Sequence, residues 1–231
     1  MTESAPAVTA APAPTLAGLA RRIGWRGAAD AVVPVVLFVT LDAAAGLVAA
    51  MAAATAWAVA LAVWRIAHRQ RTGIWLWVAL GYVLVRGIAG MLTQSKVVFF
   101  GPGVAQTGLI GVLFVISVLA RRPAVGYIAP VIYPFDDYVR QHPAYRRAFT
   151  HLTLLWAVYL IAHVVLDVWL LKNVSASAYV VIRSLVSWPM LLVLFVFSLR
   201  YPRRVFRREP DLVPYVDAAE SRTPAPVAPA G

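Results

Sequence analysis

The stretch LTLLWAVYLIAHVVLDVWLL, residues 152–171, decides the fold class of this protein. About 20 predominantly apolar residues in a helix cross the roughly 30 Å of hydrocarbon in a bilayer. The whole chain shares this bias, because 61% of its 231 residues are hydrophobic and only 13% are charged. A soluble domain is nearer half apolar and a quarter charged, and one core of this size could not bury the excess. The sequence therefore predicts an all-α polytopic membrane protein.

Four further apolar blocks lie at residues 27–64, 74–92, 103–119 and 179–199. The first block is about twice the length of one span. It predicts a hairpin with a helix over 28–41, a turn at 42–46 and a second helix over 47–64. The expected domain, residues 27–204, then holds six transmembrane helices. A re-entrant or interfacial first helix is the alternative, since only about fourteen residues of that block precede Asp42.

Both ends of the chain are rich in alanine and proline and lack an apolar period. Such segments cannot bury enough surface to offset the entropy of ordering. We expect residues 1–26 and 205–231 to be disordered tails on the cytoplasmic side.

The arginines decide the orientation of the spans. They form four clusters: Arg21, Arg22 and Arg26; Arg65, Arg69 and Arg71; Arg121, Arg122, Arg140, Arg146 and Arg147; and Arg200, Arg203, Arg204, Arg207 and Arg208 with Arg222. With six spans all four clusters share one side, and the other side keeps only Lys96 and Lys172. Basic residues near span ends stay inside, so both termini are predicted to be cytoplasmic in a bacterial inner membrane. A net charge of +11 then reflects topology and attraction to anionic lipid rather than nucleic acid.

Five polar residues fall within the predicted spans: Arg86, Gln106, His163, Asp167 and Arg183. A charge at this depth costs on the order of 3 kcal/mol, so it normally faces the bundle or a wet cavity. His163 and Asp167 are four apart and share a helix face. Arg86 and Asp167 have similar predicted depths, which predicts an ion pair between them. A polar binding pocket or proton pathway and a purely structural pair both remain open.

The segment between the fourth and fifth spans is the longest internal polar one. It alternates apolar residues with arginines, which is typical of a stretch lying on the inner leaflet. The expected lipid-headgroup contacts are Arg121, Arg122, Arg140, Arg146, Arg147, Arg203 and Arg204. Adjacent Asp136 and Asp137 point about 100° apart on a helix and indicate a solvated turn. The tetrad GPGV, residues 101–104, is typical of a helix start and is expected to open the fourth span.

Catalytic motifs are not found in the sequence. It has no cysteine, no zinc-type histidine pair, no phosphate loop and no nucleophile elbow. We therefore expect no enzyme activity, no catalytic residues, no metal and no cofactor.

Three segments resemble the bacterial inner-membrane septation protein A family. They are VVPVVLFVTLDAAAGLVAAMAAATAWAVALAVWR at 32–65, FVISVLARRPAVGYI at 114–128 and FTHLTLLWAVYLIAHVVLDVWLL at 149–171. The FFGPG run and the long basic segment are more similar to a divergent actinobacterial branch. The resemblance implies a non-enzymatic role in cell-envelope synthesis or septation, with division or envelope-synthesis membrane proteins as partners. A small secondary transporter or lipid-handling protein that uses Arg86, His163 and Asp167 is the alternative.

Overall fold

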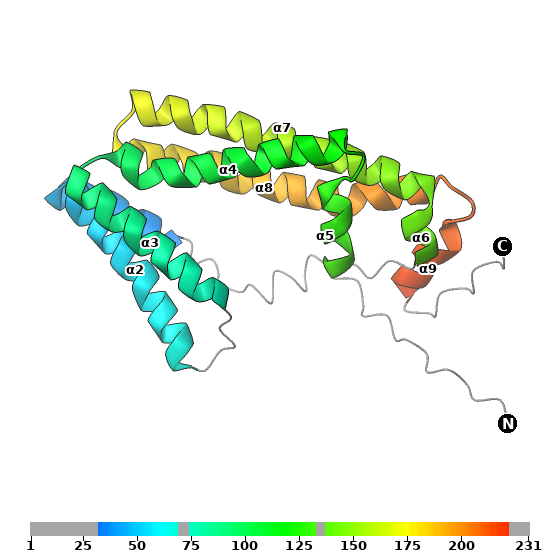
Figure 1. Cartoon of the computed structure of the whole chain (residues 1–231), viewed down its shortest axis with the longest axis horizontal. Helices are drawn as coiled ribbons and strands as arrows, with labels where there is room; N and C mark the ends of the chain where they lie inside the picture. The colour runs from blue at the N-terminus through cyan, green and yellow to red at the C-terminus, as the bar shows by residue number, and fades with distance from the viewer. Residues whose placement is uncertain (1–31, 69–73, 133–136, 222–231) are drawn as a thin grey trace. The chain divides into compact units, whose positions relative to one another are not determined.

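The computed structural model describes residues 32–68, 74–132 and 137–221, and these residues are helical apart from short turns. No strand occurs within those ranges. The helices in chain order are Val32–Ala45, α2 (Leu47–Ala67), α3 (Ile74–Thr93), α4 (Lys96–Leu119), α5 (Ala124–Ile132), α6 (Asp137–Gln141), α7 (Pro143–Asn173), α8 (Ala176–Phe206) and α9 (Val213–Ser221) (Figure 1).

Five of these helices are long and apolar enough to span a membrane, namely α2, α3, α4, α7 and α8. This confirms the predicted all-α membrane fold. The described helix Val32–Ala45 is shorter, at about 21 Å for a rise of 1.5 Å per residue. By length it falls below a full span, so the described residues hold five helices long enough to span and one short apolar helix, and the sixth crossing stays a prediction.

Large apolar side chains cover the outside of these helices. On α8, Leu185, Leu192 and Val193 are each more than 60% exposed. A monomeric soluble protein rarely exposes contiguous apolar patches of this size. Lipid chains are the solvent that such a surface fits, and the chain is therefore a multi-pass membrane protein.

The chain divides into two compact units. The polar-cluster unit comprises the described residues among 32–109 and 160–189, so it holds Val32–Ala45, α2, α3, the start of α4, the end of α7 and the start of α8. Its apolar core contains Phe38, Ala50, Met51, Phe99 and Ala176. α2 packs against α3, and at Gly87 a Cβ atom would lie under 3 Å from the Thr55 side chain.

Two hydrogen bonds tie together three helix junctions of this unit. The Lys96 ammonium, beside the α3–α4 turn, donates to the Val174 carbonyl in the α7–α8 turn. The Ser177 hydroxyl donates to Asp42 near the end of the first described helix. The three junctions therefore meet at one end of the unit, as the predicted hairpins require.

The arginine-rich unit comprises residues 110–159 and 190–221 of the described chain. Here α5, α6 and α9 pack on the start of α7 and the end of α8 around a buried core. That core consists of Val139, Ala144, Tyr145, Ala148, Phe149, Leu152, Phe206 and Leu212. The Tyr145 hydroxyl donates to the Gly126 carbonyl at 2.8 Å, which fixes α5 against α7.

The structure corrects several predicted boundaries. The turn of the first hairpin lies at Gly46, with φ 85°, because the helix continues past Asp42 to Ala45. α4 begins at Lys96, so Pro102 lies inside the helix rather than opening it. The expected tail from residue 205 is helical in its first part: α8 reaches Phe206, α9 follows from Val213, and Leu212 between them is buried in the same core as Phe206. Residues 1–31 and 222–231 lie outside the described residues.

The segment after α4 also differs from the prediction. Val125 and Ala129 pack against the core on α7 and α8 instead of facing outward, while Tyr127 and Ile128 stay exposed. Part of its apolar surface is thus satisfied within the protein. Asp136 lies outside the described residues, and Asp137 begins α6.

Candidate functional site

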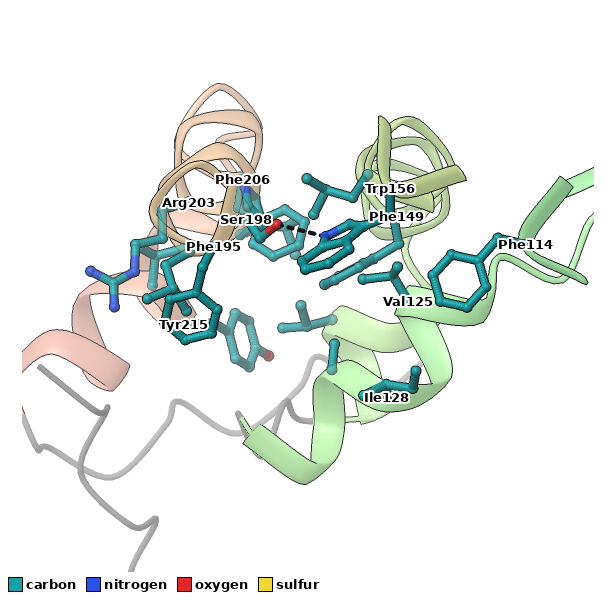
Figure 2. Close-up of a pocket in the computed structure, with 17 residues that line it drawn as sticks. Phe114, Val125, Ile128, Phe149, Trp156, Phe195, Ser198, Arg203, Phe206 and Tyr215 are labelled. Atoms are coloured by element: carbon teal, nitrogen blue, oxygen red, sulfur yellow. Dashed lines mark hydrogen bonds between the residues drawn. The ribbon is translucent and has the colours of Figure 1, made fainter. Parts of the chain in front are cut away.

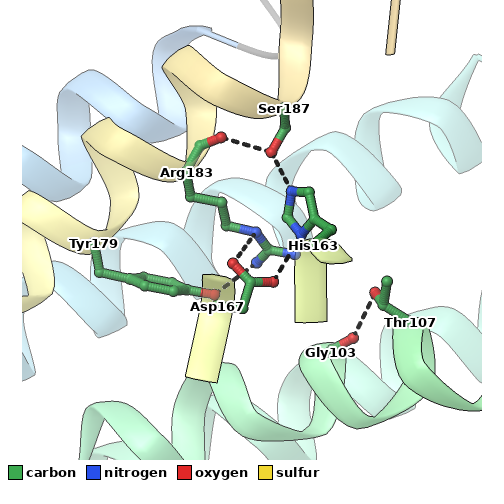
Figure 3. A network of polar contacts seen from close by, with 7 residues as sticks. All are labelled: Gly103, Thr107, His163, Asp167, Tyr179, Arg183 and Ser187. Carbon is green, nitrogen blue, oxygen red and sulfur yellow. Dashed lines mark hydrogen bonds and ion pairs between the residues drawn. The ribbon is translucent and has the colours of Figure 1, made fainter. Parts of the chain in front are cut away.

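A buried cluster of polar side chains joins α7 and α8 within the polar-cluster unit (Figure 3). α7 contributes His163 and Asp167, one helical turn apart. α8 contributes Tyr179, Arg183 and Ser187 at the same spacing. Since residues four apart share a helix face, two polar faces meet across the antiparallel pair.

Asp167 is the centre of this cluster and is fully buried. Its Oδ1 atom lies 3.3 Å from Nε of Arg183, and its Oδ2 atom lies 3.1 Å from Nδ1 of His163. Oδ1 has no hydrogen-bond partner, although it lies within ion-pair distance of Arg183. The interaction is therefore mainly Coulombic, between a buried carboxylate and a guanidinium whose side chain is 31% exposed.

The Arg183 guanidinium and Nε2 of His163 each have a further partner. Arg183 donates from Nη1 to the Tyr179 hydroxyl at 3.0 Å. Nε2 of His163 contacts the Ser187 hydroxyl, which itself donates to the Arg183 carbonyl at 2.6 Å. The arrangement can hold a charge pair and can accommodate a proton, as a buried imidazole between two oxygens does.

The predicted pair between Arg86 and Asp167 is wrong. The Arg86 guanidinium lies 5.0 Å from the centre of the Phe99 ring and 5.8 Å from that of Tyr82, so its contacts are cation–π. Its Nε atom is buried without a hydrogen bond. Arg183 takes the place next to Asp167 because α8 follows α7 after a two-residue turn, and both residues lie at similar distances from that turn.

The other predicted intramembrane residue, Gln106, does not join the cluster. It is exposed on α4, while its neighbour Thr107 bonds to the Gly103 carbonyl at 3.0 Å (Figure 3).

A second feature is an apolar pocket of about 370 Å³ in the arginine-rich unit (Figure 2). Its walls come from the end of α4, α5, α6, α7, α8, α9 and the residue just before α9. The lining residues are Phe114, Val125, Ile128, Ala129, Val139, Phe149, Leu152, Trp156, Phe195, Ser198, Leu199, Pro202, Arg203, Phe206, Leu212, Tyr215 and Val216. The Ser198 hydroxyl is already occupied, because it accepts from Trp156 at 3.0 Å and donates to Leu194 at 2.8 Å. The pocket thus suits a hydrocarbon chain better than a polar ligand.

The predicted headgroup arginines surround this unit. Arg203 lines the pocket and is partly buried, whereas the side chains of Arg121, Arg122, Arg140, Arg146, Arg147 and Arg204 are exposed. They lie near the ends of α4, α6, α7 and α8, and their contact with lipid headgroups stays a prediction.

Sequence reasoning missed Tyr179 and Ser187 in the cluster and the whole apolar pocket. The cluster had a detectable signal, because Tyr179, Arg183 and Ser187 repeat every four residues opposite His163 and Asp167. The pocket had none, since its walls come from six helices whose packing no residue spacing reveals.

The long apolar helices and the buried ionic cluster define a multi-pass helical membrane protein. The chain belongs to the family described as "Protein of unknown function (DUF3159)", which matches residues 23–209. Comparison with curated proteins and with solved structures gives no match. None of these comparisons confirms the resemblance to the septation protein A family.

Proposed function

We propose that this protein is a non-enzymatic lipid-handling protein of the bacterial cytoplasmic membrane. In this proposal the apolar pocket of the arginine-rich unit holds the hydrocarbon chain of an anionic lipid. The observation that carries it is the pocket itself: a cavity of about 370 Å³ with almost wholly apolar walls and Arg203 among its lining residues. Its size lies within the range of small-molecule sites.

Charge selects the kind of lipid. Ten arginines lie on the described part of this unit, against five acidic residues, Asp137, Glu209, Asp211, Asp217 and Glu220. Each basic residue near a surface attracts anionic lipid by roughly 1 kcal/mol. A lipid whose chain enters the pocket would meet these guanidinium groups with its headgroup.

The length of α7 and α8 supports entry from the bilayer. Each has 31 residues, or about 46 Å, which exceeds the roughly 30 Å hydrocarbon core. The arginine-bearing ends therefore reach the headgroup level, and the arginine bias supports the cytoplasmic side.

The lining chemistry supports binding rather than catalysis. The 17 lining residues include no carboxylate, histidine or lysine that would activate the Ser198 or Tyr215 hydroxyl. Transport through the polar cluster has less support, because Asp167 is fully buried and the pocket is lined by other residues.

Filling the pocket tests the proposal. In Ala129→Phe a ring would replace the small Ala129 side chain at the pocket wall. We expect the anionic lipid that copurifies with the protein in mild detergent, measured by mass spectrometry, to fall roughly fivefold or more, the factor for about 1 kcal/mol of overpacking. Ala162→Phe, at an exposed alanine of α7, should leave it unchanged.

Two arginine variants test whether the site selects lipids with an anionic headgroup. Arg203→Gln should lower the ratio of anionic to zwitterionic lipid, whereas Arg208→Gln, at an exposed arginine outside the pocket lining, should change it little. Equal lipid content in Ala129→Phe, Ala162→Phe and the natural chain would refute lipid handling at this site.

The role in envelope synthesis or septation is a second proposal. The exposed arginine surface supports it, because such a surface also suits acidic segments of partner proteins. Proximity labelling in cells separates the two: division proteins as neighbours favour this role, and enzymes of lipid metabolism favour lipid handling.

A further inference from the structure

Both ring nitrogens of the buried His163 side chain face oxygen atoms. Nδ1 lies 3.1 Å from Oδ2 of Asp167, and Nε2 contacts the Ser187 hydroxyl. A neutral imidazole carries one N–H donor and one acceptor nitrogen, while the imidazolium carries two donors. The partners therefore define which protonation states the site can hold.

The geometry of the Ser187 hydroxyl matches the protonated state. This hydroxyl has a single hydrogen, and it lies 2.6 Å from the Arg183 carbonyl, to which it donates. Its oxygen then accepts from Nε2 of His163, so Nε2 carries a hydrogen. If Asp167 is a carboxylate, it needs a hydrogen on Nδ1 as well, and the ring is an imidazolium.

One rotation produces a second satisfied state. If Nε2 loses its proton, the Ser187 hydroxyl can turn from the Arg183 carbonyl toward Nε2 and donate to it. The hydrogen on Nδ1 of His163 stays in place, because the Asp167 carboxylate accepts it. Both states leave every polar atom of the ring with a partner, which a buried group requires.

Three titratable groups face this site. On α7 it is Asp167, and on α8 they are Arg183 at 3.3 Å from Asp167 and the Tyr179 hydroxyl that accepts from Arg183. α4 brings only uncharged groups here, such as Thr107, and its one charged residue, Lys96, bonds to Val174. On α3, Arg86 is directed at the rings of Phe99 and Tyr82. Asp42, of the first described helix, is bonded to Ser177.

We propose that His163 is a proton-binding site within the membrane-spanning helices, with Ser187 as a rotating hydroxyl that follows the proton. Asp167 fixes the ring so that the proton enters and leaves at Nε2. The neutral form is then the Nδ1–H tautomer. The ligand is a single proton, and this site is independent of the lipid pocket in the other unit.

A control residue exists in the same chain. His142 accepts a hydrogen bond at Nδ1 from the Ala144 N–H at 3.2 Å. Its neutral form must therefore carry the hydrogen on Nε2. The two histidines are thus expected to be opposite tautomers in a single sample.

Nitrogen-15 NMR of the full-length protein in lipid nanodiscs, labelled at histidine and recorded over a series of pH values, tests this. His68→Gln and His151→Gln together leave two histidines, and adding His142→Gln leaves His163 alone without altering the site. We expect His163 to show two N–H groups at low pH and to lose only the Nε2 hydrogen as the pH rises, while His142 keeps its Nε2 hydrogen. An Nε2–H neutral form at His163, or one unchanging state across the range, would overturn the proposal.

Discussion

Asp167 shows how far a single residue can be interpreted from sequence. Its separation of four residues from His163 correctly predicted a shared helix face, and the two side chains are in contact at 3.1 Å. The choice of Arg86 as its partner was wrong, because depth along a helix can be counted in residues whereas the direction a neighbouring helix faces cannot. The two-residue turn between α7 and α8 favoured Arg183 over Arg86, since it makes these helices antiparallel neighbours.

A double-mutant cycle tests the pair that the structure shows. Asp167→Asn removes the partner of Arg183, and Arg183→Gln leaves the Asp167 carboxylate buried without its guanidinium. Each single change should lower stability, because an unpaired buried charge is costly. The double change should recover a coupling energy of about 0.5–3 kcal/mol, measured as thermal stability in detergent micelles.

Arg86 provides the control for this cycle. Because its guanidinium contacts Phe99 and Tyr82, the changes Arg86→Gln and Asp167→Asn should be additive within about 0.5 kcal/mol. Coupling of Asp167 to Arg86 but not to Arg183 would contradict the arrangement of the cluster.

At the scale of elements, the apolar pattern located the helices but not their ends. α7 begins at Pro143, nine residues before the apolar block, and α8 continues to Phe206, seven beyond the predicted end. Hydropathy marks the part of a helix that lies in hydrocarbon, whereas backbone hydrogen bonding continues into the headgroup region. The predicted start of α4 near Pro102 was wrong because a membrane helix tolerates proline in its interior.

Small residues set the spacing of α2 and α3, and Gly87→Ala tests this. Its Cβ atom would lie under 3 Å from the side chain of buried Thr55. We expect a loss of about 1–3 kcal/mol in thermal stability from overpacking. Combining it with Thr55→Ala should restore part of that stability, because the change removes the Thr55 atoms that lie closest to the new Cβ atom.

Gly81 is the matched control on the same helix. A Cβ atom there meets nothing within 4 Å. Gly81→Ala should therefore be neutral or stabilising by up to about 1 kcal/mol, as helix propensity predicts. Equal destabilisation by both changes would mean that α3 tolerates no substitution and that the contact with Thr55 is not the cause.

At the scale of the whole molecule, the question is how many times the chain crosses the bilayer. Five long helices would place the two ends of the chain on opposite sides, and the short helix Val32–Ala45 would return them to the same side. The Ser177–Asp42 hydrogen bond places the end of that helix beside the start of α8. Its end is thus level with the α7–α8 turn, a position that fits a sixth crossing and also fits a re-entrant or interfacial helix on that side of the membrane.

Single cysteines test this topology directly, because the natural chain has none and needs no background changes. In right-side-out membrane vesicles, a membrane-impermeant maleimide should label Lys172→Cys beside the α7–α8 turn. Arg140→Cys and Arg208→Cys, at exposed arginines of the arginine-rich unit, should react only after detergent is added, because basic span ends remain inside. Ser4→Cys distinguishes six crossings from five. If the cysteine at position 4 is protected from the maleimide, the short helix crosses the membrane. If it is labelled while Arg140→Cys stays protected, the chain crosses five times. Labelling of Arg140→Cys in intact vesicles would invert the orientation and place the lipid pocket on the outer face.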